Sequence, residues 1–229
     1  MKNYKPYGAY KDSGVEWIGK IPEGWEVIQG KRLFEQKKES YKNGDIQLSS
    51  TQKFGVIPQN MFIDIDGRNV VMAINGVEGF KHVECGDFVI SLQSFQGGVE
   101  FSKYSGCVSQ AYTVLRPYIG KDINPHFWSY LLKSTGFICA LQTVSEGIRN
   151  GKTISYEKFG GIYFPKPTFS DQKEIYIQID IQVSLIDSII EKKTRLIELI
   201  KERRSAFITA AVTGKIDLSS NSCIDGGES

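Results

Sequence analysis

The distribution of apolar and polar positions changes once along the chain, near residue 170. Before that point, short runs rich in β-branched and aromatic residues are separated by glycine and polar residues. This is the pattern of strands joined by turns. The runs cover residues 46–51, 69–74, 87–92 and 111–117. The sequence therefore predicts a twisted sheet or a partly open barrel in the first part of the chain.

Helical signals interrupt this β-rich part at one place. Asn124 is suited to cap a helix, Pro125 suits the first helical position, and apolar residues follow at helical spacing as far as Leu132. We expect this helix to end near Thr135, with a second helical stretch continuing to Val144.

A long helix is predicted after residues 165–170, where the sequence loses its turn residues. Ser170 or Asp171 can cap the start, and neither proline nor glycine occurs from there to Val212. An uninterrupted helix of roughly 40 residues would be about 60 Å long. The predicted element is longer than a compact domain usually needs.

The apolar positions of this helix keep a seven-residue rhythm, which is typical of a coiled coil. Polar Gln182, Lys193 and Arg203 interrupt the stripe and would set register and orientation. We expect the stripe to pack on a partner helix; the alternative is a helix folded back on its own sheet. The expected pairing residues are Ile179, Ile186, Ile189, Lys193, Leu196, Ile200 and Phe207.

The fold class that follows is α+β, with a β-rich domain and one long C-terminal coiled-coil helix. A chain of 229 residues with 41% hydrophobic content can bury one good core and carry one extra element. The start of the chain is polar and aromatic, and no apolar run approaches the roughly 20 residues that cross a bilayer. We expect a cytoplasmic protein without a membrane segment. The expected divisions are a domain over 1–170, the helix over 171–213 and a disordered tail over 214–229.

Charge gives a weak indication of the partner. The formal net charge is +2, but residues 1–170 hold 20 Lys and Arg against 16 Asp and Glu, whereas residues 171–229 hold 8 against 10. The basic excess therefore lies in the β-rich part, which fits a polyanion partner and equally fits an ordinary solvated surface.

The sequence offers no convincing active site, so we expect a protein with no catalysis of its own, no metal and no cofactor. His82 and His126 stand in no catalytic motif, and residues 147–153 resemble a P-loop with one residue too few between the glycines. Residues 64–67 begin like a calcium loop but lack its glutamate, and we expect a hairpin turn there. The widely spaced cysteines are expected to be free thiols: Cys85, Cys107, Cys139 and Cys223.

What remains is polar chemistry of the kind that reads DNA. Glutamine and asparagine can bond adenine bidentately, hydroxyls take either role, and lysine and arginine bind guanine or phosphate. Such residues gather in loops between the predicted strands. Taken singly, each is also an ordinary surface residue. The candidate DNA-binding residues are Ser50, Gln52, Lys53, Gln93, Ser94, Gln96, Lys103, Gln110, Tyr112, Arg149, Asn150 and Lys152.

Several segments together resemble the specificity subunits of type I restriction-modification systems. The match is most specific at the two ends of the chain, and the middle, which reads DNA in that family, matches little. The matching segments are residues 10–19, 21–27, 86–87, 111–117, 154–155, 159, 164–165, 171–173, 186–187, 192–193, 196–199, 201–204 and 211–216.

The resemblance implies a mechanism. Usual members of that family carry two target recognition domains, each followed by a helix, and the paired helices fix the spacer between two halves of a split DNA site. Modification subunits bind around those helices and methylate adenine with S-adenosylmethionine. Restriction subunits can join to translocate and cut DNA with ATP and Mg.

The sequence departs from that family in having one recognition domain and one long helix, as in a half-sized subunit. The resemblance then implies a two-fold homodimer through the helix, which reads an inverted site in double-stranded DNA. Alternatives are an adaptor that binds or sequesters modification subunits without productive DNA reading, and a truncated or engineered cassette.

Overall fold

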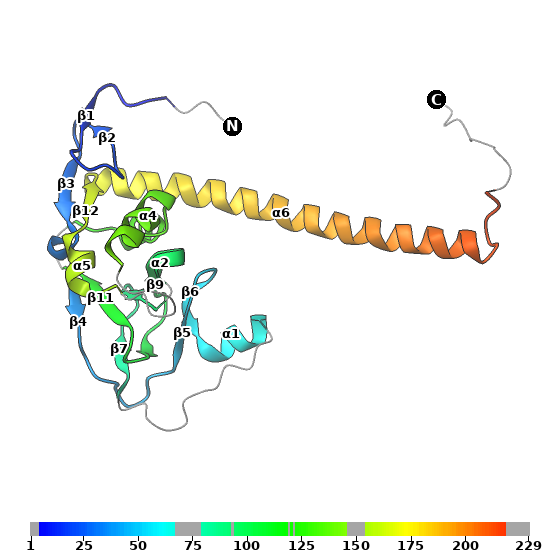
Figure 1. Cartoon of the computed structure of the whole chain (residues 1–229), viewed down its shortest axis with the longest axis horizontal. Helices are drawn as coiled ribbons and strands as arrows, with labels where there is room; N and C mark the ends of the chain where they lie inside the picture. Colours follow the sequence, from blue (N-terminus) through cyan, green and yellow to red (C-terminus); the bar gives the residue numbers. More distant parts are fainter. Residues whose placement is uncertain are drawn as a thin grey trace. The chain divides into compact units, whose positions relative to one another are not determined.

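The computed structural model describes residues 5–66, 79–92, 94–118, 120, 122–145 and 154–218. The chain divides into two compact units, Met1–Tyr176 and Ile177–Ser229. The first is mixed α and β, and the second consists of most of one long helix (Figure 1). The expected α+β class, with a β-rich part followed by a long C-terminal helix, is therefore confirmed.

Strands in the first unit form small antiparallel sheets. The largest has the order β4-β11-β8-β9, and the remaining strands pair as β1-β2, β10-β7, β12-β3 and β5-β6. The strands are β1 (Tyr10–Asp12), β2 (Lys20–Pro22), β3 (Glu26–Gln29), β4 (Phe34–Lys37), β5 (Leu48–Thr51), β6 (Gly55–Pro58), β7 (Lys81–Val83), β8 (Phe88–Ile90), β9 (Glu100–Phe101), β10 (Gly106–Val108), β11 (Thr113–Pro117) and β12 (Tyr163–Lys166).

Short helices connect and cover these strands. They are η1 (Gly30–Arg32), α1 (Gln59–Asp66), α2 (Ser94–Gly97), α3 (Pro125–Leu131), α4 (Thr135–Val144) and α5 (Tyr156–Gly161). The long helix is α6 (Phe169–Val212).

Most of the strand predictions are confirmed. The runs at 46–51, 87–92 and 111–117 contain β5, β8 and β11, while the run at 69–74 lies outside the described residues. The hairpin turn expected at 64–67 is wrong, because residues through Asp66 form the end of α1. The short helix α1 follows a strand directly, and its short length gave little helical periodicity to detect.

The predicted helix pair is present. The side-chain oxygen of Asn124 accepts hydrogen bonds from the backbone N–H groups of His126 (3.0 Å) and Phe127 (3.3 Å), and Pro125 occupies the first turn. The first helix ends at Leu131, slightly earlier than expected, and Ser134 caps the next one, α4. Separate caps explain why one apolar stretch becomes two helices.

Aromatic rings dominate the larger core, which lies between the four-stranded sheet and helices α3 to α5. Phe34 lies 5.4 Å from Phe88 and 5.5 Å from Trp128, measured between ring centroids, and both contacts are edge-to-face. Phe164 of β12 contacts Trp128 at 5.6 Å, which joins the β3-β12 pair to the same core. Edge-to-face pairs favour one fixed arrangement of these elements.

A smaller core holds the β5-β6 hairpin. Its members are aliphatic, with Tyr104 and Tyr112 packed against them. Because this cluster includes Leu48 at the start of β5 and Val56 close to the turn, one face of the hairpin is buried along its length, while residues 52–54 of the turn are exposed. The buried members are Leu48, Val56, Val83, Val89, Val108 and Val114.

The first turn of α6 belongs to the first unit. The hydroxyl of Thr168 accepts the backbone N–H of Asp171 at 3.2 Å, so Thr168 supplies the cap that we expected from Ser170 or Asp171. Packing places the boundary between the units after Tyr176, six residues beyond the expected boundary at 170.

In the second unit, α6 exposes most of its apolar stripe. The exposed fraction is 53% for Ile186, 52% for Leu196 and 57% for Ile200. Ile189, Phe207 and Lys193 are also exposed, and Ile179 is half-buried. The helix ends at Val212, and Gly214 in the turn that follows has a φ of 71°, which suits the end of a helix. Among the described helices, none combines the length and apolar character needed to cross a bilayer.

Candidate nucleic-acid interface

The turn between β5 and β6 carries the most exposed group of predicted DNA-binding residues. Gln52, Lys53 and Phe54 are exposed, and the Lys53 amine lies 5.0 Å from the centre of the Phe54 ring. The Thr51 hydroxyl accepts the N–H of Phe54 at 3.0 Å and donates to the carbonyl of Gly55 at 3.0 Å. These bonds define the shape of the turn and leave its polar side chains facing solvent.

Helix α2 packs against the same turn. A Cβ placed on Gly97 would lie 2.6 Å from Cγ of Gln52, so a larger residue there would force the Gln52 side chain to move. Gln96 is exposed beside it. Ser94 does not fit the surface role that we predicted, because it is buried and its hydroxyl accepts the N–H of Ser91 at 2.8 Å. Its position at the start of α2 gives it a structural role.

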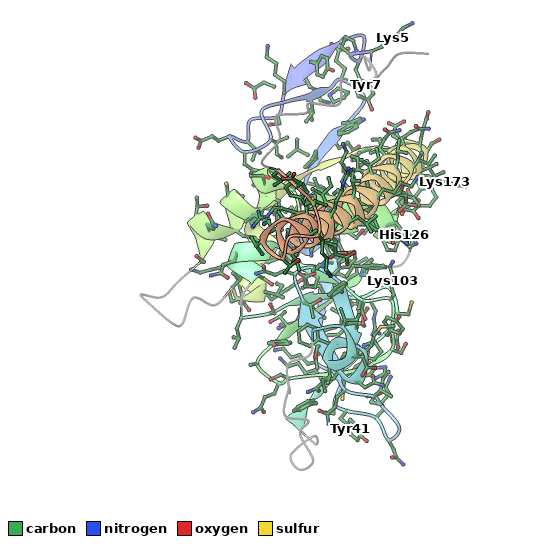
Figure 2. The ribbon with its side chains drawn as sticks, turned by 90° about the vertical axis from the view of Figure 1, so that its right-hand side faces the viewer. Lys5, Tyr7, Tyr41, Lys103, His126 and Lys173 are labelled. Carbon is green, nitrogen blue, oxygen red and sulfur yellow. The ribbon has the colours of Figure 1, made fainter. Side chains whose placement is uncertain are left out.

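A third segment, residues 102–104, lies beside β6. Ser102 forms a parallel bridge with Val56, and the Ser102 hydroxyl donates to the carbonyl of Tyr104 at 2.7 Å. Lys103 is exposed between them (Figure 2) and has no ion-pair partner among the described residues. The hydroxyl of Tyr104 reaches the sulfur of Met61 on α1 at 3.9 Å, which places α1 next to this segment.

These contacts bring together residues that are far apart in the sequence. We call Gln52, Lys53, Gln96 and Lys103 the reading surface. It presents two amides and two cations from three segments, all built around the β5-β6 hairpin. A side-chain amide offers one donor and one acceptor, which complement the acceptor and donor that adenine presents in the major groove, and cations bind phosphate.

One ion pair, between half-buried Lys133 and buried Glu100, supports this surface. The Lys133 amine lies 2.7 Å from Oε2 of Glu100, and it also donates a hydrogen bond to the backbone carbonyl of Gln52. The Glu100 side chain is only 2% exposed. Burial raises the pKa of Glu100 to about 7, although the nearby Lys133 amine opposes that rise. Sequence reasoning missed both residues, since no motif surrounds either of them.

The other predicted DNA-binding residues are less clearly placed. Gln110 is exposed, whereas Tyr112 is half-buried against the smaller core and its carbonyl accepts a bond from the Lys81 amine. The Ser50 hydroxyl is enclosed and has no hydrogen-bond partner among the described residues. Four further residues lie outside the described part of the chain: Gln93, Arg149, Asn150 and Lys152.

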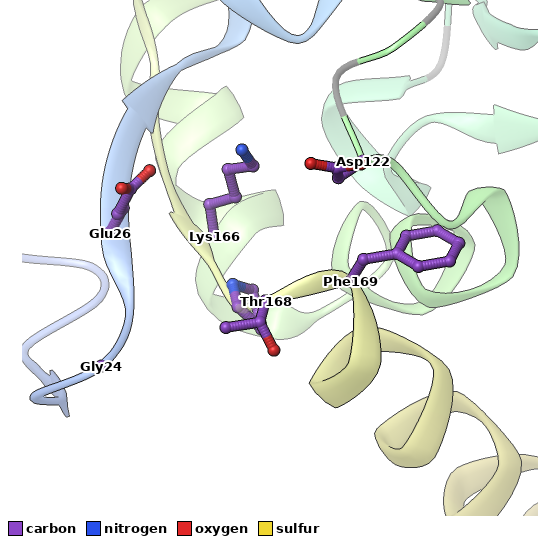
Figure 3. Close-up of a pocket in the computed structure, with 7 residues that line it drawn as sticks. Gly24, Glu26, Asp122, Lys166, Thr168 and Phe169 are labelled. Carbon is purple, nitrogen blue, oxygen red and sulfur yellow. The ribbon is translucent and has the colours of Figure 1, made fainter.

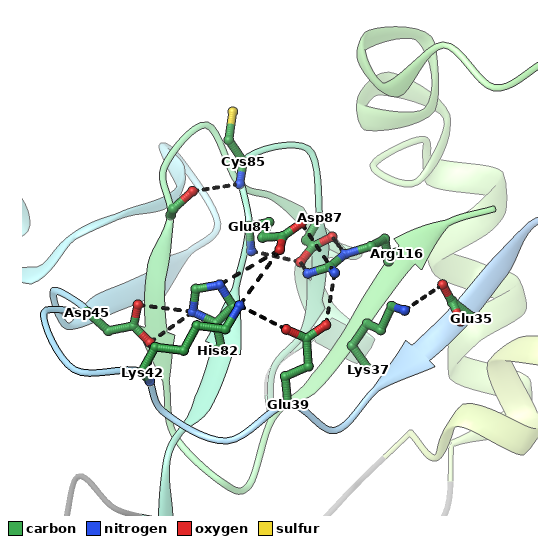
Figure 4. A network of polar contacts seen from close by, with 11 residues as sticks. Glu35, Lys37, Glu39, Lys42, Asp45, His82, Glu84, Cys85, Asp87 and Arg116 are labelled. Carbon is green, nitrogen blue, oxygen red and sulfur yellow. Dashed lines mark hydrogen bonds and ion pairs between the residues drawn. The ribbon is translucent and has the colours of Figure 1, made fainter. Parts of the chain in front are cut away.

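A second polar cluster centres on Arg116 (Figure 4). Its guanidinium binds both oxygens of Asp87 at 2.8 Å and one oxygen of Glu39 at 2.9 Å. Glu39, His82 and Glu84 have ligand atoms within 4.8 Å of one another, a spacing that a metal ion could use. Arg116 contacts both of those carboxylates, at 3.2 Å in the case of Glu84, so they already have a cationic partner. The geometry is that of an ion network that joins β4, β7, β8 and β11.

A cavity of about 240 Å³ lies near the start of α6 (Figure 3). It is bounded by the carboxylates of Glu26 and Asp122 and by the amine of Lys166. Its volume is below the roughly 300 Å³ at which ligand pockets usually begin. Its lining includes Thr168, whose hydroxyl already accepts the backbone N–H of Asp171 as the cap of α6.

The fold of this chain is similar to that of solved structures. No protein-family model matches the chain. A chain from a solved type I restriction-modification system, described for its complex assembly and conformational transition, has a TM-score of 0.62 at 14% identity. The similarity covers 88% of this chain and 48% of that one. At the level of the fold, this confirms the resemblance noted in the sequence.

Two further solved structures are similar to a lower degree. The HsdS subunit from Thermoanaerobacter tengcongensis has a TM-score of 0.49 at 16% identity, over 78% of this chain and 42% of that one. The S subunit of a type I system from M. genitalium has a TM-score of 0.45 at 14% identity, over 87% and 48%. The chain spans about half the length of the solved chains that it matches.

Proposed function

We propose that this chain is the DNA-reading specificity subunit of a type I restriction-modification complex and has no catalysis of its own. The observation that carries the proposal is the reading surface, where exposed amides and cations from three segments converge on one hairpin. That surface occurs in a fold shared with a component of a type I system. Fold similarity alone does not fix function, and the surface supplies the chemistry.

In this proposal the two cations have the simpler task. Lys53 and Lys103 bind phosphates of double-stranded DNA and fix the register of the hairpin on the duplex. Gln52 and Gln96 then present amides to base edges, where an amide distinguishes adenine from other bases. The chain reads one half of a split site in this way.

The long helix α6 is the proposed binding site for the partner proteins. An exposed apolar stripe on α6 favours docking of modification subunits and pairing with a second copy in a two-fold dimer. Methylation with S-adenosylmethionine belongs to the modification subunits. Cleavage belongs to restriction subunits where these join, with ATP and Mg. The complex would act in the cytoplasm, where its DNA substrate is found.

The test is to co-express the chain with a modification subunit and to map methylated adenines in the host DNA. We expect methylation at one split, inverted sequence that disappears when the chain is omitted. Suppressed methylation in the presence of the chain would instead support an adaptor that sequesters modification subunits. Methylation that is independent of the chain would contradict the proposal.

Light scattering over a concentration series supplies a second test of assembly. A dimer, or two copies joined to two modification subunits, supports the two-fold arrangement. A monomer that ignores the modification subunit contradicts docking through α6.

A further inference from the structure

Lys133 connects three segments that are separate in the sequence. It lies in the turn between α3 and α4, yet its amine donates to the backbone carbonyl of Gln52 in the β5-β6 turn. The same amine lies 2.7 Å from the buried carboxylate of Glu100 at the start of β9. The Lys133 side chain is 31% exposed, so most of its stem is covered.

The backbone around Lys133 leaves little room for alternative arrangements. The N–H of Val99 donates to the carbonyl of Leu132 at 3.1 Å. Gly98, with a φ of 84°, approaches that same carbonyl so closely that a Cβ would collide with it. The segment before Glu100 is therefore fixed against the segment before Lys133, and this holds the two charged groups within reach of each other.

We infer that Lys133 is a positioning residue for the DNA-reading turn, held in place by Glu100 and acting through the backbone of Gln52. The inference rests on the proposed function. Base readout needs side chains placed within about 0.5 Å of their productive positions. A turn at the end of a hairpin reaches that precision only when contacts outside the hairpin restrain it. Lys133 supplies such a contact from a helical turn anchored in the larger core.

A direct phosphate contact by Lys133 is the competing explanation, because its side chain is partly exposed. The two explanations differ in salt dependence. Losing one phosphate contact reduces the slope of log affinity against log salt by about 1, whereas losing a restraint on the turn leaves that slope unchanged.

The first experiment needs no DNA. Hydrogen exchange is followed in peptides that span 51–56 and, as an internal reference, 113–117 in the central strand β11 of the Lys133→Met variant. Methionine keeps the apolar stem and removes the amine. We expect exchange at 51–56 to accelerate on the order of tenfold while 113–117 changes little. Equal acceleration in both peptides, or none in either, would overturn the inference.

A second variant separates loss of the contact from destabilisation of the fold. Removing the amine leaves Glu100 buried without its partner, which is costly. The double variant Lys133→Met/Glu100→Gln removes both charges and restores a neutral pair. We expect the double variant to show the same faster exchange at 51–56, with the reference peptide as slow as in the unmodified chain. A return to slow exchange at 51–56 would show that the charge imbalance, and not the lost tether, loosened the turn.

The second experiment uses a duplex selected by the unmodified chain, together with modification subunits, from a random library, and a shuffled duplex of equal composition. For Lys133→Met we expect affinity for the selected duplex to fall about tenfold and affinity for the shuffled duplex to change less than twofold, with the salt slope unchanged. The control is Lys20→Met on the β1-β2 hairpin, which we expect to match the unmodified chain.

Two results would overturn the inference here. Equal weakening on both duplexes with a smaller salt slope would assign Lys133 to phosphate binding. Unchanged affinity for both duplexes would show that Lys133 does not contribute to DNA recognition. If the unmodified chain selects no duplex at all, the proposed function is wrong. The exchange experiment still tests whether Lys133 restrains the β5-β6 turn.

Discussion

The indole N–H of Trp128 donates a hydrogen bond to the side-chain carbonyl of Gln172 across 44 residues of sequence, at 3.2 Å. The same oxygen accepts the backbone N–H of Asn124 at 2.9 Å, and the Gln172 amide donates to the carbonyls of Asp122 and Pro167, each at 3.0 Å. Gln172 is fully buried, and its amide fixes the first turn of α6 on α3.

Gln172→Leu should therefore destabilise the first unit strongly. The change leaves two donors and two carbonyls of the same region without partners, and each buried unsatisfied group costs about 1–3 kcal/mol. Allowing for relaxation and water entry, we expect a loss of about 3 kcal/mol in the free energy of unfolding. Urea denaturation measures it. The exposed neighbour Lys173→Ala is the control, and a loss below about 1 kcal/mol for Gln172→Leu would contradict the assigned role.

Sequence reasoning located the large elements because their signals are local. Asn124 and Pro125 carry the cap of α3 in adjacent positions, and the interval from Asp171 to Val212 contains nothing that breaks a helix. The four residues of the reading surface were all among the candidates predicted from polar loops, but the sequence did not indicate that they lie together. Neither the short helix α1 nor the convergence of these loops has such a local signal.

The supporting residues could not be found in the same way. Glu100 and Lys133 meet across 33 residues, and nothing near either one marks it as paired. Ser94 shows the reverse case, because a polar residue in a polar run was taken for surface and is buried under a local hydrogen bond. A contact between distant segments decides the first case and a bond three residues away decides the second, and a single sequence records neither of them.

The buried carboxylate of Glu100 predicts a pH dependence of stability. Its pKa is about 7 in the folded chain against an ordinary value of 4.5, so the folded state binds more protons than the unfolded state between these values. Stability contributed by the protonated form is thus present below about pH 4.5 and is lost as pH rises through 7. The loss amounts to about 3 kcal/mol at most.

Glu100→Gln should remove this dependence, because the amide does not titrate. We expect the difference in unfolding free energy between the two proteins to change steadily from pH 5 to pH 8, with the variant gaining relative stability at the alkaline end. Urea denaturation at several pH values gives this difference directly. Parallel profiles would mean that Glu100 is ionised throughout and that Lys133 fully compensates its burial.

Arg116 should tolerate replacement by lysine poorly. Its guanidinium binds both oxygens of Asp87, whose side chain is 2% exposed, and these contacts raise the pKa of Arg116 above its ordinary value. Lysine cannot form the paired contact, so one of the two short charged bonds to Asp87 is lost, although Oδ2 keeps the backbone N–H of Glu84 at 2.8 Å. We expect Arg116→Lys to cost about 2 kcal/mol of unfolding free energy.

The matched control for Arg116 is Lys37→Gln, which breaks an ion pair with Glu35 at 2.8 Å between more exposed side chains. Surface pairs of this kind contribute about 0–1 kcal/mol. Denaturation midpoints of the two variants should differ clearly, and equal midpoints would show that the Arg116 network adds no more than a surface pair.

Substitutions at two residues of the reading surface should impair DNA binding in different ways. Lys103→Met should weaken binding to all duplexes similarly and lower the salt slope by about 1. Gln52→Ala should keep the slope and lose about 1–3 kcal/mol of discrimination at one base pair. Affinities measured at several salt concentrations on selected and singly altered duplexes separate the two. The same slope change in both variants would remove Gln52 from base readout.

The exposed stripe of α6 predicts how assembly responds to charge. Leu196 is 52% exposed in the single chain, and its heptad position places it on the seam of a helix pair. Leu196→Lys would bury an ammonium group on each helix of a two-fold dimer, so we expect the dimer dissociation constant to rise by at least about tenfold. Thr194→Lys adds the same charge two residues away, off the seam, and should leave the solution mass unchanged. Light scattering over a dilution series compares the two variants. Equal dissociation of both variants would indicate general charge repulsion. If the unmodified chain is itself a monomer, the stripe does not mediate self-pairing.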